Sequence, residues 1–193
     1  MLLPTLLFLI LFIAAVLVLP SLHRIGPTEV GLVLRRFSSR RLTDDNPIAF
    51  NGEAGYQAEL LMPGMRFKLW ILYGVEKYPW VQIPAGQIGV VIAQIGEPLP
   101  NGAKSAMYRS EFEQFTDLDA FVKFGGQKGV QRPVLPPGTT LPLHPVAFLV
   151  ITRERVFGIP ISEELARQPK LVPEVFGLTR SEERRVGKEC RSR

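Results

Sequence analysis

The side chains that could perform chemistry are few in this chain, and they are scattered along it. It has two histidines, His23 and His144, and one cysteine, Cys190. A zinc site needs several ligands at matching spacing, and neither histidine has a second one close to it. Covalent catalysis needs a nucleophile, a base and an electrophile that converge, and the sequence lacks a Gly-x-Ser-x-Gly elbow. We therefore expect a protein that is not an enzyme and that has no cofactor or metal.

Two short segments resemble ligand-binding loops only superficially. Gly125-Gly-Gln-Lys-Gly129 lacks the spacing of a phosphate loop and follows an expected helix rather than a strand, so it is interpreted as a helix stop and turn. Asp44-Asp45-Asn46 resembles the start of a calcium loop, but the other ligands of an EF-hand do not follow. Neither segment predicts a bound nucleotide or calcium ion.

The charges with the strongest functional pattern are five arginines that follow the apolar N-terminus, namely Arg24, Arg35, Arg36, Arg40 and Arg41. They could contact anionic lipid headgroups, each contributing about 1 kcal/mol near a membrane surface. Alternatively, they lie in a solvated loop and only set membrane orientation. The sequence leaves both interpretations open.

The last residues of the chain are excluded from fold reasoning. Residues 180–193 match the translation of a sequencing-library adapter at every position. They hold six of the 23 basic and three of the 18 acidic residues, so the rest of the chain has a net charge of +2 instead of +5. The basic composition therefore predicts no nucleic-acid partner. Cys190 lies in this segment too, and we expect the natural protein to continue after residue 179.

Residues 2–19 form an apolar run without a charge, interrupted only by Pro4 and Thr5. As a helix the run would be about 27 Å long, close to the roughly 30 Å hydrocarbon core of a bilayer. A cleaved signal peptide would need a basic start and a small-residue cleavage site, and both are missing. A buried core helix would be expected to have a polar face. The run predicts a transmembrane anchor within residues 1–22, with lipid-facing side chains at Leu6, Phe8, Ile10, Phe12, Val16 and Leu19.

The distribution of positive charge predicts the orientation of this anchor. All the arginines near it lie on its C-terminal side. Positive charge favours the cytoplasmic side of a membrane, so we expect a single-pass protein whose remaining part is cytoplasmic.

One phrase occurs twice. Ile25-Gly-Pro-Thr-Glu-Val-Gly-Leu-Val33 returns as Ile83-Pro-Ala-Gly-Gln-Ile-Gly-Val-Val91, and each copy is followed later by a Pro-Gly pair, at Pro63-Gly64 and Pro137-Gly138. Self-similarity of this kind indicates one β-unit used twice. The 17 glycines and 17 prolines also argue against a helical bundle.

The local patterns predict an α+β fold that is rich in strands and has few helices. Strands are expected at 29–37, 66–70, 71–83, 87–95, 146–153 and 156–159, with a loop over 38–64. A helix is expected over 111–124, where Ser110 and Glu113 match a capping box. Its phenylalanines, three residues apart, either pack on the sheet or form a surface for a partner or membrane.

An apolar anchor followed by Pro27-Thr-Glu-Val-Gly-Leu-Val33 and Pro63-Gly-Met-Arg-Phe67 resembles the SPFH/Band 7 family, which includes stomatin, prohibitin and flotillin. The segments 50–60, 115–121, 125–129 and 134–139 add to this resemblance, which covers roughly residues 3–179 and is strongest to bacterial flotillin-like inner-membrane proteins. The residues that carry it most directly are Glu29, Gly31, Pro63, Gly64, Gln87, Gly89, Pro137 and Gly138.

The resemblance implies a membrane-anchored scaffold that organises membrane microdomains or protein assemblies in the bacterial inner membrane. It implies a lipid bilayer and further copies of the chain as partners. The alternative is a regulatory subunit that binds a membrane protease or another membrane protein. We expect an anchor at 1–22, a membrane-proximal β segment at 23–82, an SPFH-like domain at 83–168, the start of a C-terminal region at 169–179, and the adapter-derived tail at 180–193.

Overall fold

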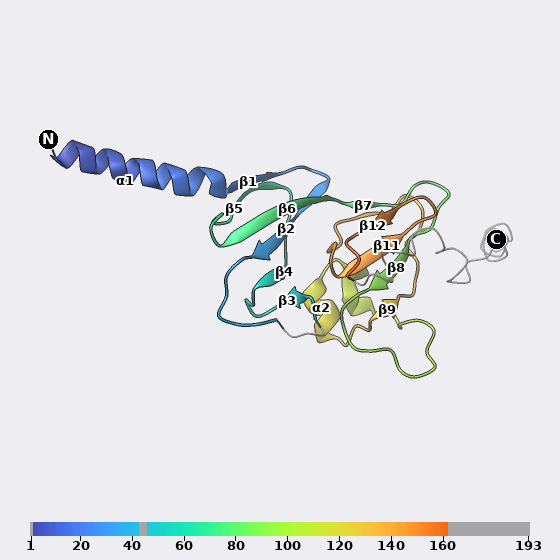
Figure 1. Ribbon diagram of the computed structural model, residues 1–193. Coiled ribbons are helices and arrows are strands. Elements are labelled where there is room, and N and C mark those ends of the chain that lie inside the picture. Colours follow the sequence, from blue (N-terminus) through green and yellow to red (C-terminus); the bar gives the residue numbers. More distant parts are fainter. Residues whose placement is uncertain (1, 43–45, 162–193) are drawn as a thin grey trace.

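The computed structural model describes residues 2–42 and 46–161, which are mostly β-strand with few helices (Figure 1). The helices are α1 (Leu2–Val18), η1 (Leu19–Ser21), η2 (Ser110–Phe115) and α2 (Leu118–Lys123). The strands are β1 (Leu22–Ile25), β2 (Glu29–Arg35), β3 (Ile48–Ala49), β4 (Gly55–Leu61), β5 (Gly64–Phe67), β6 (Tyr73–Pro79), β7 (Val81–Gln82), β8 (Val90–Ala93), β9 (Gly129–Val130), β10 (Thr140–Leu141), β11 (Phe148–Ile151) and β12 (Val156–Phe157).

The N-terminal helix corrects one prediction. Helix α1 has 17 residues, which corresponds to about 25 Å. Within the described part of the chain, no helix combines the length and hydropathy needed to cross a membrane. The prediction of a transmembrane helix within residues 1–22 is therefore wrong. The helix ends at Val18 and gives way to the 3-10 turn η1, because Pro20 has no N–H to donate and disfavours helical backbone at the residue before it.

Residues 22–79 form the first unit of the fold. Strand β2 is the centre of a four-stranded sheet with the order β3-β4-β2-β6, and it pairs antiparallel with both β4 and β6. Strands β1 and β5 make a separate antiparallel ribbon at the end of α1 (Figure 1). Pro79 ends the edge strand β6, a position where its missing N–H costs no ladder hydrogen bond.

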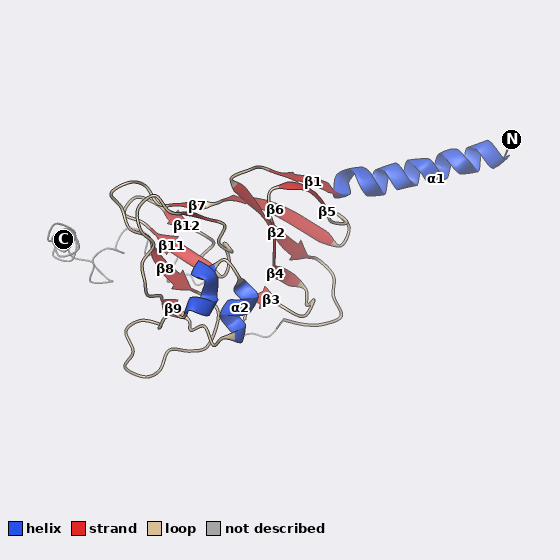
Figure 2. Cartoon of the chain, turned by 180° about the vertical axis from the view of Figure 1, so that it is seen from behind, coloured by secondary structure: helices blue, strands red, loops and turns tan. Residues whose placement is uncertain are grey.

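Residues 81–159 form the second unit. Strand β8 lies inside a four-stranded sheet with the order β12-β11-β8-β9, as the apolar run over 87–95 predicts for a buried strand. Strands β7 and β10 form a two-stranded ribbon. The elements η2 and α2 belong to the connection between β8 and β9, and Figure 2 shows α2 from behind next to β3 and β4 of the first unit.

The two units have matching backbone pairings around the repeated phrase. In the first unit Ile25 pairs with Gly64, and Gly31 pairs with Leu61. In the second unit the Ile83 carbonyl accepts a hydrogen bond from the Gly138 N–H at 2.9 Å, and Gly89 pairs with Leu135. Each phrase thus contacts its own Pro-Gly turn, although beyond the turn the pairing differs by one residue, because Phe67 pairs with Leu22 and Leu141 pairs with Val81.

Both copies of the phrase have the same spacing between an isoleucine and a glycine, and this spacing has a steric cause. A Cβ atom on Gly31 would lie 2.7 Å from Cδ1 of Ile25, and one on Gly89 would lie 2.5 Å from Cδ1 of Ile83. In both units the isoleucine side chain therefore packs directly over the glycine. Both isoleucines are buried.

The repeat is longer than the phrase and the Pro-Gly pairs suggest. Residues 50–64 and 124–138 share Phe-x-Gly-(Glu/Gln)-x-Gly-x-Gln-x3-Leu-x-Pro-Gly. The Gln57 side-chain amide donates to the carbonyls of Glu53 and Gly55, and that of Gln131 donates to the carbonyls of Gln127 and Gly129. Gly55 and Gly129 both have positive φ, at 123° and 103°, which favours glycine there.

Two secondary-structure predictions in this region are wrong. The expected loop over 38–64 contains β3 and β4, which pair through long-range sheet contacts that a local turn composition does not reveal. The expected helix over 111–124 is broken into η2 and α2, because Glu113, Gln114 and Phe115 have positive φ. The Ser110–Glu113 capping box does not form, and Asp117 caps α2 instead by accepting from the Ala120 N–H at 2.9 Å.

The two units share one hydrophobic core. Buried Leu32 and Ile48 of the first unit belong to the same cluster as Val91, Phe121 and Phe148 of the second. The phenylalanines of η2 and α2 pack on the second sheet, where the ring centroids of Phe121 and Phe148 are 5.1 Å apart. Of the expected aromatic stripe, only Phe124 is exposed.

Candidate functional site

Helix α1 carries an exposed apolar surface around its circumference. The residues that the sequence predicts to face lipid are all solvent-exposed, namely Leu6, Phe8, Ile10, Phe12, Val16 and Leu19. Helix α1 projects away from both units (Figure 1). A helix that is apolar on every side is stable only when an apolar environment surrounds it.

The end of α1 is hydrogen-bonded to the first unit through Ser21. The Ser21 hydroxyl donates to the Leu17 carbonyl and accepts from the Trp70 N–H at 3.3 Å. The Ser21 carbonyl accepts from the Lys68 N–H at 3.0 Å. Ser21 is fully buried, so these contacts are shielded from water. The direction of α1 is therefore coupled to the segment that follows β5.

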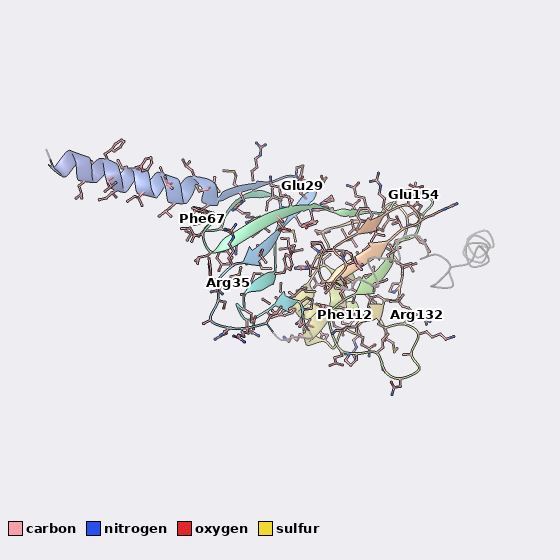
Figure 3. The ribbon with its side chains drawn as sticks, in the orientation of Figure 1. Glu29, Arg35, Phe67, Phe112, Arg132 and Glu154 are labelled. Atoms are coloured by element: carbon pink, nitrogen blue, oxygen red, sulfur yellow. The ribbon has the colours of Figure 1, made fainter. Side chains whose placement is uncertain are left out.

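Strands β1 and β5 and the segment that follows β5 form an exposed patch of large apolar side chains beside α1, which we call the apolar patch. Its members are Leu22, Met65, Phe67, Leu69, Trp70, Ile71 and Leu72. Leu22 and Arg24 pair with Phe67 and Met65, and cross-strand partners share a face, so these four side chains lie together. Figure 3 shows Phe67 next to the end of α1.

The structure brings only some of the predicted headgroup-binding arginines to this patch. Arg24 is exposed next to Met65, and the Arg36 N–H donates to the Leu72 carbonyl at 2.9 Å. The Arg35 guanidinium donates to the carbonyls of Gly52 and Phe37, and lies 6.0 Å from the Tyr73 ring.

The remaining two arginines lie on the loop that follows β2. The Arg40 guanidinium donates to the Asn51 carbonyl at 2.9 Å, and Arg41 is exposed. Of the five arginines, Arg24 thus shares a face with members of the apolar patch, and Arg36 is bonded to Leu72 through its backbone only.

The residues that carry the family resemblance have structural positions in the two units. The Glu29 carboxylate accepts from the Gly26 N–H at 3.1 Å and closes the turn before β2. Gly31 and Gly89 make room for an isoleucine, as described above, and Pro63-Gly64 and Pro137-Gly138 form the matching turns. Gln87 lies in the turn before β8, where its N–H donates to the Pro84 carbonyl at 3.2 Å.

His144 is buried between the two units and has a turn role. Its Nδ1 accepts from the N–H groups of Val146 and Ala147, and its Nε2 lies 3.0 Å from the Gln57 carbonyl. Since Nδ1 is an acceptor, Nε2 carries the proton and donates it to Gln57. Burial lowers the His144 pKa to about 4, so the ring is neutral at pH 7.

The segment 125–129, which resembles a phosphate loop superficially, includes the glycine that ends α2. In the segment 125–129 the Gly126 N–H donates to the Phe121 carbonyl at 2.8 Å, so this glycine ends α2. Asp44 and Asp45 lie outside the described residues, as does Cys190. Across residues 2–42 and 46–161 there is no group of three or more His, Cys, Asp or Glu side chains placed to hold a metal ion.

No family model, curated protein or solved structure matches this chain.

Sequence reasoning missed the apolar patch. Its signal was present, because residues 65–72 read Met-Arg-Phe-Lys-Leu-Trp-Ile-Leu, an apolar segment rich in large side chains. We expected residues 66–70 to be a half-buried strand and residues 71–83 to be a further strand. The side chains of β5 are exposed because β5 pairs with β1 in a separate ribbon. The composition of the segment does not reveal this pairing.

Proposed function

We propose that this protein is a membrane-attached scaffold of the flotillin-like type, located on the cytoplasmic face of the bacterial inner membrane. Helix α1 attaches it to the lipid, and the two β-units form a platform on which copies of the chain and other membrane proteins assemble. The observation that carries this proposal is the exposed apolar surface of α1, which surrounds the helix over residues 6–18.

The energetic argument for attachment is strong. Burying one leucine or phenylalanine side chain is favourable by about 1.5–3 kcal/mol, and α1 exposes many such side chains. A helix that paired with one partner helix would need an apolar stripe only on one side. The all-round apolar surface favours lipid as the surrounding medium. The resemblance of several sequence phrases to SPFH proteins supports the scaffold role.

Attachment is tested by flotation of the full chain with phospholipid vesicles. The variant Phe8→Lys/Phe12→Lys places two charges on the apolar surface of α1, and charged side chains are unfavourable in lipid. We expect the wild-type chain to float with the vesicles and the variant to remain mostly at the bottom of the gradient. Met107→Lys is the matched control, because Met107 is exposed on the second unit far along the chain from α1. Equal flotation of all three proteins would overturn attachment through α1.

Assembly is tested by chemical crosslinking of the vesicle-bound chain. We expect ladders of homo-oligomers on the membrane. A chain that stays monomeric on vesicles and crosslinks in native membranes only to a membrane protease, at a fixed ratio, would contradict the scaffold role.

A further inference from the structure

Strand β6 of the first unit is equivalent to β11 of the second. Leu32 and Val90 each follow the glycine of their copy of the repeated phrase. Leu32 pairs with Glu76 of β6, and Val90 pairs with Ile151 of β11. Glu76 therefore occupies the position that Ile151 has in the second unit.

A hydrogen bond at the start of each strand supports this equivalence. The N–H of Tyr73, the first residue of β6, donates to the Leu69 carbonyl at 2.8 Å. The N–H of Phe148, the first residue of β11, donates to the His144 carbonyl at 3.0 Å. Both strands thus begin with the same turn, and their residues correspond one to one.

The two strands differ at their outer edges. Strand β12 lies next to β11, where Phe157 pairs with Val150 and the Thr152 N–H donates to the Arg155 carbonyl at 2.8 Å. Strand β6 ends its sheet, and no strand within residues 2–42 and 46–161 pairs with its outer side. The same position of the fold is therefore filled in the second unit and open in the first.

The open side of β6, which we call the β6 edge, presents the backbone groups of Val75 and Lys77. The Trp80 N–H, directly after β6, donates to the Thr28 carbonyl at 2.9 Å. Bonding direction alternates along an antiparallel strand, so the even-numbered residues of β6 face β2 and the odd-numbered residues face outward. Outward N–H and C=O groups of this kind can pair with another extended chain.

The side chains along the β6 edge define which strand would fit it. Val75 packs on the small cluster around buried Val33, whereas Glu76 and Lys77 are exposed. Opposite charges attract across neighbouring strands, and like charges repel. A fitting strand therefore has an acidic residue opposite Lys77, a basic residue opposite Glu76 and a bulky apolar residue opposite Val75.

The same side chains disfavour pairing with β6 of a second copy. A two-fold axis at Glu76 would place two glutamates opposite each other, and an axis at Lys77 would do the same with two lysines. An axis at Val75 would place Lys77 opposite Tyr73, whose N–H already donates to the Leu69 carbonyl. A different segment therefore fits the edge better than β6 itself.

We infer that the β6 edge is a binding site for a partner protein, which adds an extended segment to the first sheet as an antiparallel strand. In chain order this segment has an acidic, a basic and a bulky apolar residue, opposite Lys77, Glu76 and Val75. Main-chain hydrogen bonds supply the affinity, and the three side chains supply the specificity. The inference rests on the proposed function for the nature of the partner, a protein held on the same platform.

Binding is tested with a labelled synthetic peptide, Thr-Asp-Lys-Phe-Thr-Val-Thr, which has this order of residues. One control peptide exchanges its Asp and Lys, and a second has an N-methyl group on the phenylalanine nitrogen, which removes the N–H that would pair with the Val75 carbonyl. Fluorescence polarisation measures binding to the full chain in phospholipid nanodiscs. We expect each control peptide to bind about tenfold more weakly than the probe.

Variants of the chain locate the site. Lys77→Pro removes an N–H that points away from β2, so it costs no hydrogen bond of the sheet. We expect this variant to lose binding of the probe, whereas Lys77→Ala, the matched control, keeps the N–H and should weaken binding less. The exchange Glu76→Lys/Lys77→Glu keeps the backbone intact and should make the chain prefer the peptide with Asp and Lys exchanged.

Hydrogen exchange gives a direct readout at the edge. We expect the probe to slow exchange of the Val75 and Lys77 amides. Slow exchange of both amides without peptide, appearing as the protein concentration rises, would mean that a second copy covers the edge and would overturn the inference. Equal binding of the three peptides, or of the probe to Lys77→Pro and Lys77→Ala, would also overturn it.

The outcomes separate this inference from the proposed function. Chains that float with vesicles and form homo-oligomers but do not bind the probe would overturn the inference alone. Chains that bind the probe at β6 but neither float nor assemble would overturn the proposed function, while the β6 edge would remain a peptide-binding site.

Discussion

The packing of one isoleucine over one glycine is the smallest feature that the two units share. Gly31 and Gly89 both have a backbone conformation open to other residues, so steric contact and not φ demands glycine there. The sequence alone predicted the pairing of these positions in two copies, because the spacing Ile-x5-Gly is identical in both phrases. It could not predict that the isoleucine side chain itself fills the space above the glycine.

A double-mutant cycle on Ile83 and Gly89 tests this contact. Gly89→Ala alone should lower the free energy of unfolding by about 1–3 kcal/mol, because the new Cβ would overlap with Cδ1 of Ile83. Ile83→Val alone removes Cδ1 and should cost about 1 kcal/mol. The double variant should be more stable than the sum of the single effects predicts, as measured by urea unfolding in detergent micelles. Strict additivity would contradict the packing.

The helix that the sequence predicts over 111–124 shows how packing overrides a local pattern. Residues 112 and 121 would be about 13 Å apart along a continuous helix. Their ring centroids are 4.9 Å apart in the structure, since the chain reverses through three residues of positive φ. Such residues cost roughly 1–2 kcal/mol each, and buried aromatic pairs contribute about 0.5–1.5 kcal/mol beyond their burial. The aromatic spacing therefore indicates that these side chains are core residues, but it does not predict the path of the backbone.

The true start of α2 can be distinguished from the predicted start by two substitutions. Asp117→Ala removes the carboxylate that accepts from the Ala120 N–H, and it should destabilise the protein by about 1 kcal/mol. Ser110→Ala should change stability by less than about 0.5 kcal/mol, because the Ser110 side chain caps no helix. Both variants are compared with the wild type by urea unfolding. A larger loss for Ser110→Ala than for Asp117→Ala would show that the helix begins at the earlier position.

On the scale of the whole molecule, the sequence predicted a β-rich chain built on one repeated motif, and it failed on the features that depend on distant parts of the chain. Strands β3 and β4 lie in a segment with the composition of a loop, and they are strands because β4 pairs with β2 and β3 pairs with β4. The helix at the N-terminus is shorter than the apolar run, because Pro20 ends it early.

His144 joins the two units, and its protonation should weaken their contact. Its Nε2–H donates to the Gln57 carbonyl, 87 residues away in the chain, while Nδ1 accepts two backbone N–H groups. A protonated ring has no acceptor for those N–H groups. Burial lowers the pKa of folded His144 to about 4 from an ordinary value of 6.5. Between these values the unfolded chain binds a proton that the folded chain does not, so His144 makes stability fall as the pH decreases from 6.5 to about 4.

The variant His144→Asn separates this effect from the titration of carboxylates. An asparagine oxygen can still accept from the turn N–H groups, but the side chain does not titrate. The pKa difference corresponds to about 3 kcal/mol, so the wild type should lose up to that much more stability than the variant between pH 7 and pH 4. Urea unfolding of both proteins in detergent micelles over this range measures the difference, because the carboxylates are common to the two chains. Parallel stability curves would show that His144 is already protonated in the folded protein or is not buried between the units. A steeper loss of stability in the wild type would instead mean that acid weakens the contact between the two units, since Gln57 and His144 lie on opposite sides of that contact.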